Sequence, residues 1–87
     1  MMSAIMESES RKRQITHLLS LVEDVDEIIE KDVKNLTHQD SSVRVASRFA
    51  VSEYKRHRQE LIHQINALVA VYKFQITEMR EELTPSV

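Results

Sequence analysis

Apolar residues in the first part of the chain recur at alternating steps of three and four positions, the spacing of one face of an α-helix. The series, broken once at Asp32, is Ile15, Leu18, Val22, Val25, Ile29 and Leu36. Leu19, Leu21, Ile28 and Val33 widen this stripe into a face, and charged or polar residues fill the other side. The pattern predicts a helix from about residue 10 to 35, with Ser8 or Ser10 as its N-cap.

The second helical pattern begins after a short polar break at residues 36–41. Asn35 is the best residue available for a left-handed helix end in a chain without glycine. Asp40, Ser41 and Ser42 are all good N-caps for the helix that follows. A connection this short predicts that the second helix returns antiparallel to the first.

The second helix is predicted over about residues 42–83, ended by Thr84 and Pro85. Its main apolar face comprises Val43, Ala46, Ala50, Tyr54, Leu61, Ile65, Leu68, Tyr72 and Met79. An unbroken seam of steps of three and four, typical of a coiled coil, comprises Ile62, Ile65, Val69, Tyr72, Ile76, Met79 and Leu83. Ala67, Val71 and Phe74 form a further strip, so this helix is expected to be buried on more than one side.

The composition favours the same all-α interpretation. The 87 residues include no Gly, no Cys and one Pro, Pro85, so long helices are the default and disulfides are excluded. The length allows one domain, residues 1–87. The start of the chain lacks a basic segment followed by an apolar run, and the longest uncharged run, residues 61–72, is shorter than the roughly 20 residues that cross a bilayer. We therefore expect a cytoplasmic protein.

Opposite charges also favour the antiparallel arrangement. Residues 23–32 carry six acidic groups and one Lys, and residues 44–58 carry five basic groups and one Glu. These two stretches lie side by side if the chain turns near Asp40. Exposed ion pairs contribute only about 0.2–1 kcal/mol each, so the charges are expected to set orientation and register more than stability.

Two helices form only a thin core, and the second is predicted to be ten to fifteen residues longer than the first, with an apolar excess. We therefore predict an antiparallel two-helix hairpin, coiled-coil-like, that completes a helical bundle by homo- or hetero-oligomerisation. The predicted partner-binding residues are Ile62, Val69, Val71, Phe74, Ile76 and Met79. The expected function is non-catalytic protein–protein interaction, as an adaptor or a chaperone-like small subunit that binds a helical partner or a second copy.

Two other classes remain open. A small dimeric nucleic-acid-binding regulator would use the basic residues Arg44, Arg48, Lys55, Arg56 and Arg58, although a net charge of −2 gives no reason to expect nucleic acid as the main partner. A helical-bundle metalloprotein would use Glu60 and His63, an E-x-x-H pair, but both lie off the apolar face. No residues suggest catalysis or a cofactor. In size and two-helix format, the predicted chain resembles the hairpin co-chaperones of bacterial type III secretion systems, which implies a helical partner.

Overall fold

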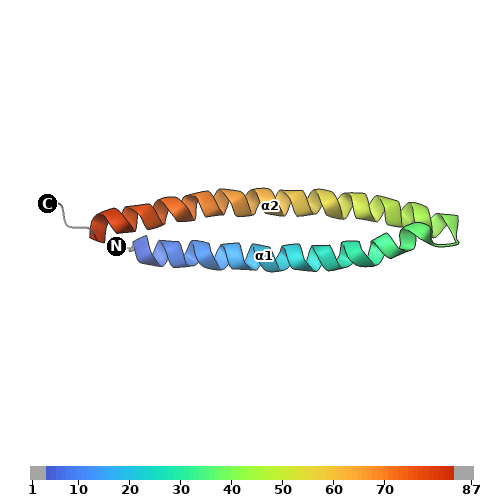
Figure 1. The fold of residues 1–87 in the computed structure, drawn as a ribbon, viewed down its shortest axis with the longest axis horizontal. Helices are drawn as coiled ribbons and strands as arrows, with labels where there is room; N and C mark the ends of the chain where they lie inside the picture. Colours follow the sequence, from blue (N-terminus) through green and yellow to red (C-terminus); the bar gives the residue numbers. More distant parts are fainter. Residues whose placement is uncertain (1–3, 84–87) are drawn as a thin grey trace.

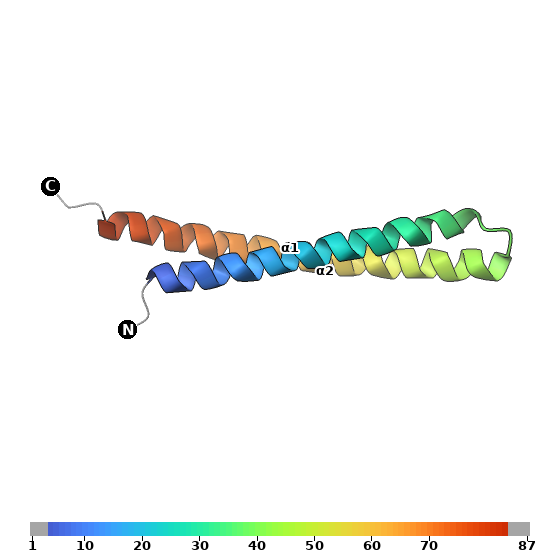
Figure 2. The same ribbon diagram turned by 90° about the horizontal axis from the view of Figure 1, so that it is seen from below.

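The structure is a computed structural model that describes residues 4–83, with the side chains of residues 5–81. It contains two α-helices, α1 (Ala4–Lys34) and α2 (Ser41–Leu83), joined through a 3-10 turn, η1 (Asn35–Thr37). The helices run side by side in opposite directions, with the connection at one end of a rod (Figures 1 and 2). The rod measures 72 × 17 × 17 Å. The prediction of an all-helical chain with two helices is confirmed, and no strand is present between Ala4 and Leu83.

α1 begins at Ala4, six residues before the predicted start. The hydroxyl of Ser8 donates to the carbonyl oxygen of Ile5 at 2.9 Å and lies 3.7 Å from the sulfur of Met79. A serine that bonds back to the preceding turn sits inside a helix without ending it, so the prediction of Ser8 or Ser10 as the N-cap is wrong. The predicted helix end at Thr84 and Pro85 lies outside the described residues.

The early start of α1 shortens the expected overhang of α2 at its C-terminal end. α2 has 43 residues and α1 has 31, so the predicted difference in length is present. Because Ser8 contacts Met79, however, α1 covers the apolar C-terminal part of α2. α2 extends beyond α1 at both ends of the rod, past the start of α1 at one end and beside η1 and the connection at the other (Figures 1 and 2).

The connection uses no left-handed residue. None of the described residues has a positive φ, so the prediction of a left-handed end at Asn35 is wrong. Instead α1 tightens into η1, and His38 then adopts an extended conformation with φ −61° and ψ 149°. The Arg44 guanidinium donates to the carbonyl oxygens of His38 and Gln39, at 2.7 and 2.9 Å. These bonds satisfy backbone carbonyl groups of the connection and so stabilise a turn that contains no glycine.

Asp40 is the N-cap of α2, one of the three caps predicted. Its Oδ1 accepts from the backbone N–H of Ser42 at 2.9 Å and from the Ser42 hydroxyl at 2.7 Å. These hydrogen bonds lower the pKa of the Asp40 carboxyl below its usual value near 3.8, and the bond from the Ser42 hydroxyl contributes most. The cap fixes the first turn of α2 at the point where the chain reverses.

The core is a single line of side chains between the helices. Val22, Val25, Leu61 and Ile65 are buried together at its centre. Partly buried side chains surround them, namely Ile15, Leu18, Leu21, Ile29, Tyr54, Ile62 and Val69. The accessible surface is 6970 Å², whereas a compact monomer of 10.2 kDa exposes about 5,300 Å². The pair of helices therefore leaves an unusually large surface uncovered.

Candidate partner-binding surface

The two helices meet along a seven-residue repeat, which we call the interface seam. On α1 the seam comprises Ser8, Arg11, Ile15, Leu18, Val22, Val25, Ile29 and Asp32, all buried or half-buried. On α2 it comprises Arg44, Ser47, Val51, Tyr54, Arg58, Leu61, Ile65, Leu68, Tyr72, Gln75 and Met79, again all buried or half-buried. Both sets alternate steps of three and four without a break, as the a and d positions of a coiled coil do. The α1 stripe predicted from sequence is this seam.

Near the connection, the predicted face of α2 is displaced by one position. Ala46 is exposed and Ala50 half-buried, whereas the neighbouring Ser47 and Val51 are buried. The structure continues the repeat of 3.5 residues set by Leu61 and Ile65, which places Ser47 and Val51 in the seam. Small apolar alanines carry too little surface to override that repeat.

Polar groups fix the register of the seam. The Arg58 Nε donates to Asp26 Oδ1 at 2.6 Å, and Ser8 lies against Met79. Residue n of α1 is therefore level with about residue 85 − n of α2. Gln75 adds a buried Oε1 that has no hydrogen-bond partner among the described residues. Polar seam positions lower stability but specify one alignment.

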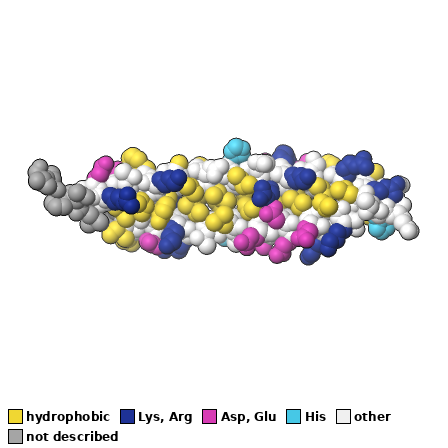
Figure 3. Space-filling model, in the orientation of Figure 1, with side chains coloured by type: hydrophobic (Ala, Val, Ile, Leu, Met, Phe, Trp, Pro, Cys, Tyr) yellow, Lys and Arg dark blue, Asp and Glu magenta, His cyan; other side chains and the backbone are white. Residues whose placement is uncertain are grey.

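One long side of the seam is apolar, and we call it the apolar flank. It comprises apolar residues at the e positions, namely Ile5, Leu19, Ile62, Val69 and Ile76, and charged residues occupy the e positions 12, 26, 48 and 55. Leu19 is level with a point between Ile62 and Val69, which pack against the core from this side. Leu19 is 50% exposed and Ile5 is 57% exposed. On the face drawn in Figure 3, hydrophobic side chains form a band along the line between the helices.

The opposite side, which we call the mixed flank, has both polar and apolar residues. Its g positions include Gln14, Leu21, Ile28, Gln64 and Val71. A shallow open groove of about 480 Å³ lies here, lined by Arg11, Gln14, His17, Leu18, Gln64, Ala67 and Leu68. The groove shows that these positions of the two helices share one side of the rod.

The six residues predicted to bind a partner do not form one surface. Ile62, Val69 and Ile76 are half-buried on the apolar flank, and Met79 lies in the interface seam. Val71 (42% exposed) lies on the mixed flank, with Phe74 (64% exposed) further round on the same side. A single partner helix cannot cover both flanks at once, because they lie on opposite sides of the seam. The partner role of each group stays a prediction.

The five basic residues predicted as nucleic-acid contacts also separate. Arg44 binds the connection, Arg58 binds Asp26, and Arg56 binds Glu53 on the same helix at 2.8 Å. The hydrogen bond and the charge of Glu53 raise the pKa of the Arg56 guanidinium. Arg48 and Lys55 are exposed and make no ion pair within the described part of the chain.

The opposite charges of the two helices were expected to form several ion pairs, but the structure has one between the helices among the described residues. Across residues 5–81, Asp26–Arg58 is the sole ion pair that joins α1 to α2. Residues 23–32 are level with about residues 53–62, so only the last part of the basic stretch 44–58 lies beside the acidic one.

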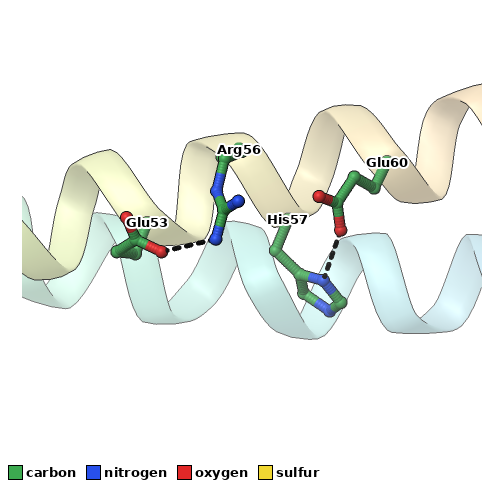
Figure 4. A network of polar contacts seen from close by, with 4 residues as sticks. All are labelled: Glu53, Arg56, His57 and Glu60. Atoms are coloured by element: carbon green, nitrogen blue, oxygen red, sulfur yellow. Dashed lines mark hydrogen bonds and ion pairs between the residues drawn. The ribbon is translucent and has the colours of Figure 1, made fainter.

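The E-x-x-H pair of α2 is on the outer surface. Glu60 and His63 are both exposed, and Glu60 Oε2 lies 3.9 Å from His57 Nδ1, beside the Glu53–Arg56 pair (Figure 4). Within the described residues, no three His, Asp or Glu side chains come together as a metal site. These contacts link neighbouring turns of one helix.

Sequence reasoning missed two exposed apolar residues near the connection, Val45 (63%) and Phe49 (70%). They fall at outward positions once Ser47 and Val51 define the seam. The face predicted from sequence assigned Ala46 and Ala50 to the interface. The outward positions of Val45 and Phe49 were therefore not recognised. The seven-residue repeat, extended back from Leu61, is the signal that could have found them.

Comparison of the chain with family models, with curated proteins and with solved structures gave no match. Neither helix, over residues 4–83, has a stretch long and apolar enough to cross a membrane. We therefore infer the function of the chain from its surfaces.

Proposed function

We propose that this protein is a non-catalytic interaction module, a helical hairpin that completes a four-helix bundle with a helical partner. In this role it acts as a small adaptor or chaperone-like subunit. The observation that carries the proposal is the apolar flank, a line of apolar side chains from both helices left half-buried or exposed beside the seam.

A second seam on each helix supports a bundle. On α2, steps of three and four join Ile62, Ile65, Val69, Tyr72, Ile76 and Met79. On α1 the corresponding set is Ile15, Leu19, Val22, Ile29 and Val33, with Asp26 completing the spacing. These a and e positions are turned by about 50° from the interface seam toward the apolar flank. A helix with two adjacent seams packs against two neighbours, as in a four-helix bundle.

The basic residues favour protein over nucleic acid as the partner. Three of the five candidates are engaged within the chain, by the connection, by Asp26 and by Glu53. A nucleic-acid surface needs several free cations aligned on one face. Of the five, Arg48 and Lys55 are exposed and make no ion pair among the described residues. They lie on the same side of the rod as the acidic residues Glu23 and Glu30 of α1, which repel a nucleic-acid backbone.

The test compares matched variants of the two flanks. Leu19→Ser with Ile76→Ser removes apolar surface from the apolar flank, and Val71→Ser with Phe74→Ser removes it from the opposite side of the rod. Circular dichroism checks helicity, sedimentation equilibrium gives the mass, and binding of 8-anilinonaphthalene sulfonate reports uncovered apolar surface. We expect a wild-type mass above 10.2 kDa, lost only in the apolar-flank variant, with helicity retained in both.

Two results would contradict the proposal. Loss of association in the Val71 and Phe74 variant alone would move the partner to the opposite side of the rod. A wild-type protein of 10.2 kDa that binds no dye would show that neither flank offers an interaction surface.

A further inference from the structure

We infer that the partner on the apolar flank is a second copy of this chain, packed with both connections at the same end of the dimer. This inference rests on the proposed function and names its partner and geometry. Three features carry it: the size of the face, the two seams described above, and the distribution of charge beside the apolar flank.

The face is large enough for a stable dimer. One long side of a rod 72 Å by 17 Å offers roughly 1,200 Å², and a specific interface takes about 800 Å² from each partner. The surface that the chain exposes beyond that of a compact monomer, roughly 1,600 Å², is ample for such a contact. A second hairpin has the same length as this face and can cover all of it.

The charges beside the apolar flank differ in sign between the two helices. At the e and b positions of α1 the charged residues are Glu9, Lys12, Glu23, Asp26 and Glu30, of which only Lys12 is basic. At the same positions of α2 they are Arg48, Lys55, Lys73 and Arg80, all basic. Each copy therefore presents a mainly acidic edge along α1 and a basic edge along α2.

A two-fold axis can relate two such faces in two ways. If the axis runs along the rod, α1 of one copy lies over α2 of the other, and every neighbouring pair of helices is antiparallel. Acidic edges then face basic edges. If the axis runs across the rod, α1 lies over α1 and α2 over α2, which brings edges of like charge together. Like charges across an interface oppose association, so the structure favours the first arrangement.

The register places particular charges together in this arrangement. Glu30 of one copy is level with Lys55 of the other, and Glu9 is level with residue 76, three positions from Lys73. All four side chains are exposed, and none of them forms an ion pair among the described residues. They are thus available to pair between copies.

Spin labels on introduced cysteines test the geometry directly, because the chain has no cysteine of its own. A label at Gln39→Cys, on the exposed connection, should give a distance of about 20–30 Å between copies, since packed helices lie 8–10 Å apart. The arrangement with connections at opposite ends would place these labels near 72 Å apart, the length of the rod. His63→Cys, an exposed position midway along α2, is the matched control because it gives a short distance in either dimer.

A charge-reversal series tests the same geometry independently. Glu9→Lys with Glu30→Lys should raise the dimer dissociation constant about tenfold, because each reversal acts twice across a two-fold interface. Adding Lys55→Glu and Lys73→Glu to that chain should restore most of the affinity. Failure of the second pair to restore affinity would overturn the assigned pairing.

The outcomes separate this inference from the proposed function. A short distance at both labels supports the same-end dimer. A short distance at His63→Cys with a long one at Gln39→Cys overturns the geometry and leaves the interaction function standing. If neither label shows a second copy at high micromolar concentration, self-association is overturned. The interaction function then stands if the wild-type apolar flank binds the dye, and it falls if no dye binds.

Discussion

The two flanks of the rod are built from the same helices and the same repeat, yet they expose different chemistry. On the apolar flank, Ile62, Val69 and Ile76 continue a second seam, joined by Leu19 from α1. On the mixed flank, the matching positions alternate Gln14 and Gln64 with Leu21 and Val71. Polar groups between apolar ones keep a surface hydrated, whereas a continuous apolar run such as Ile62, Val69 and Ile76 on α2 favours another helix. The difference shows how a pair of helices can bind a further helix on one side and remain exposed to solvent on the other.

The largest effect should come from the seam between the flanks. Leu61 is 4% exposed, and Ile65 is buried beside it. Truncating either to Ala should lower the free energy of unfolding by about 2–5 kcal/mol, because the cavity adds to the lost burial. Urea unfolding measures this loss. A change below about 1 kcal/mol would mean that these side chains are not the centre of the core.

Two residues that pack on the core from opposite flanks give a sharper comparison. Ile62 and Leu21 are both half-buried against the same core cluster. If a second copy covers the apolar flank, Ile62 is fully enclosed, so Ile62→Ala should cost about 2–4 kcal/mol per chain and Leu21→Ala about 1–2 kcal/mol. Equal losses in urea unfolding at high protein concentration would indicate that both flanks are equally exposed.

Gln75 permits a stabilising substitution within the seam. Its Oε1 is buried without a hydrogen-bond partner among the described residues, and an unsatisfied acceptor costs about 1–3 kcal/mol. Gln75→Leu should therefore raise the free energy of unfolding by about 1 kcal/mol. The control is Gln64→Leu on the mixed flank, which should change stability by less than about 0.5 kcal/mol. Destabilisation by Gln75→Leu would show that the amide has a partner in solution.

The smallest effect concerns the pH dependence of the cap on α2. The bonds from Ser42 lower the pKa of Asp40 in the folded state. The ionised carboxylate therefore stabilises the fold above its usual pKa near 3.8, and this contribution disappears as the pH falls through the lowered value. Asp40→Asn keeps the acceptor and removes the charge, so its thermal midpoint should fall less than that of the wild type between pH 6 and 2. Parallel profiles for the two proteins would contradict this role.

The sequence predicted the number of helices, the interface positions of α1 and a cap among Asp40, Ser41 and Ser42, because these depend on local spacing and side-chain chemistry. The start of α1 was missed because Ser8 suits a cap as well as an interior position, and only the helical turn before it, to which its hydroxyl donates at the Ile5 carbonyl, distinguishes the two. The loop-proximal face of α2 was displaced because Ala46 and Ala50 are apolar, whereas the repeat places Ser47 and Val51 in the seam.

The candidate surface could be predicted only in part. The seam through Ile62, Val69 and Ile76 was visible in the sequence, but its position relative to α1 was not. Assigning residues to flanks requires the register, which the contacts Asp26–Arg58 and Ser8–Met79 supply. Composition also overstated the ion pairing between the helices, because charges on adjacent segments pair only where the side chains meet.

The central claim, that a second copy covers the apolar flank, is tested most directly by the thermal midpoint of the wild-type protein as a function of its concentration. Association that involves only the folded state adds stability as concentration rises, about 2.7 kcal/mol per dimer for a hundredfold increase. For a chain of this size, such a gain raises the midpoint by several degrees. The account predicts this rise from micromolar to high micromolar protein. A midpoint that stays constant over the same range, with a mass of 10.2 kDa, would contradict it.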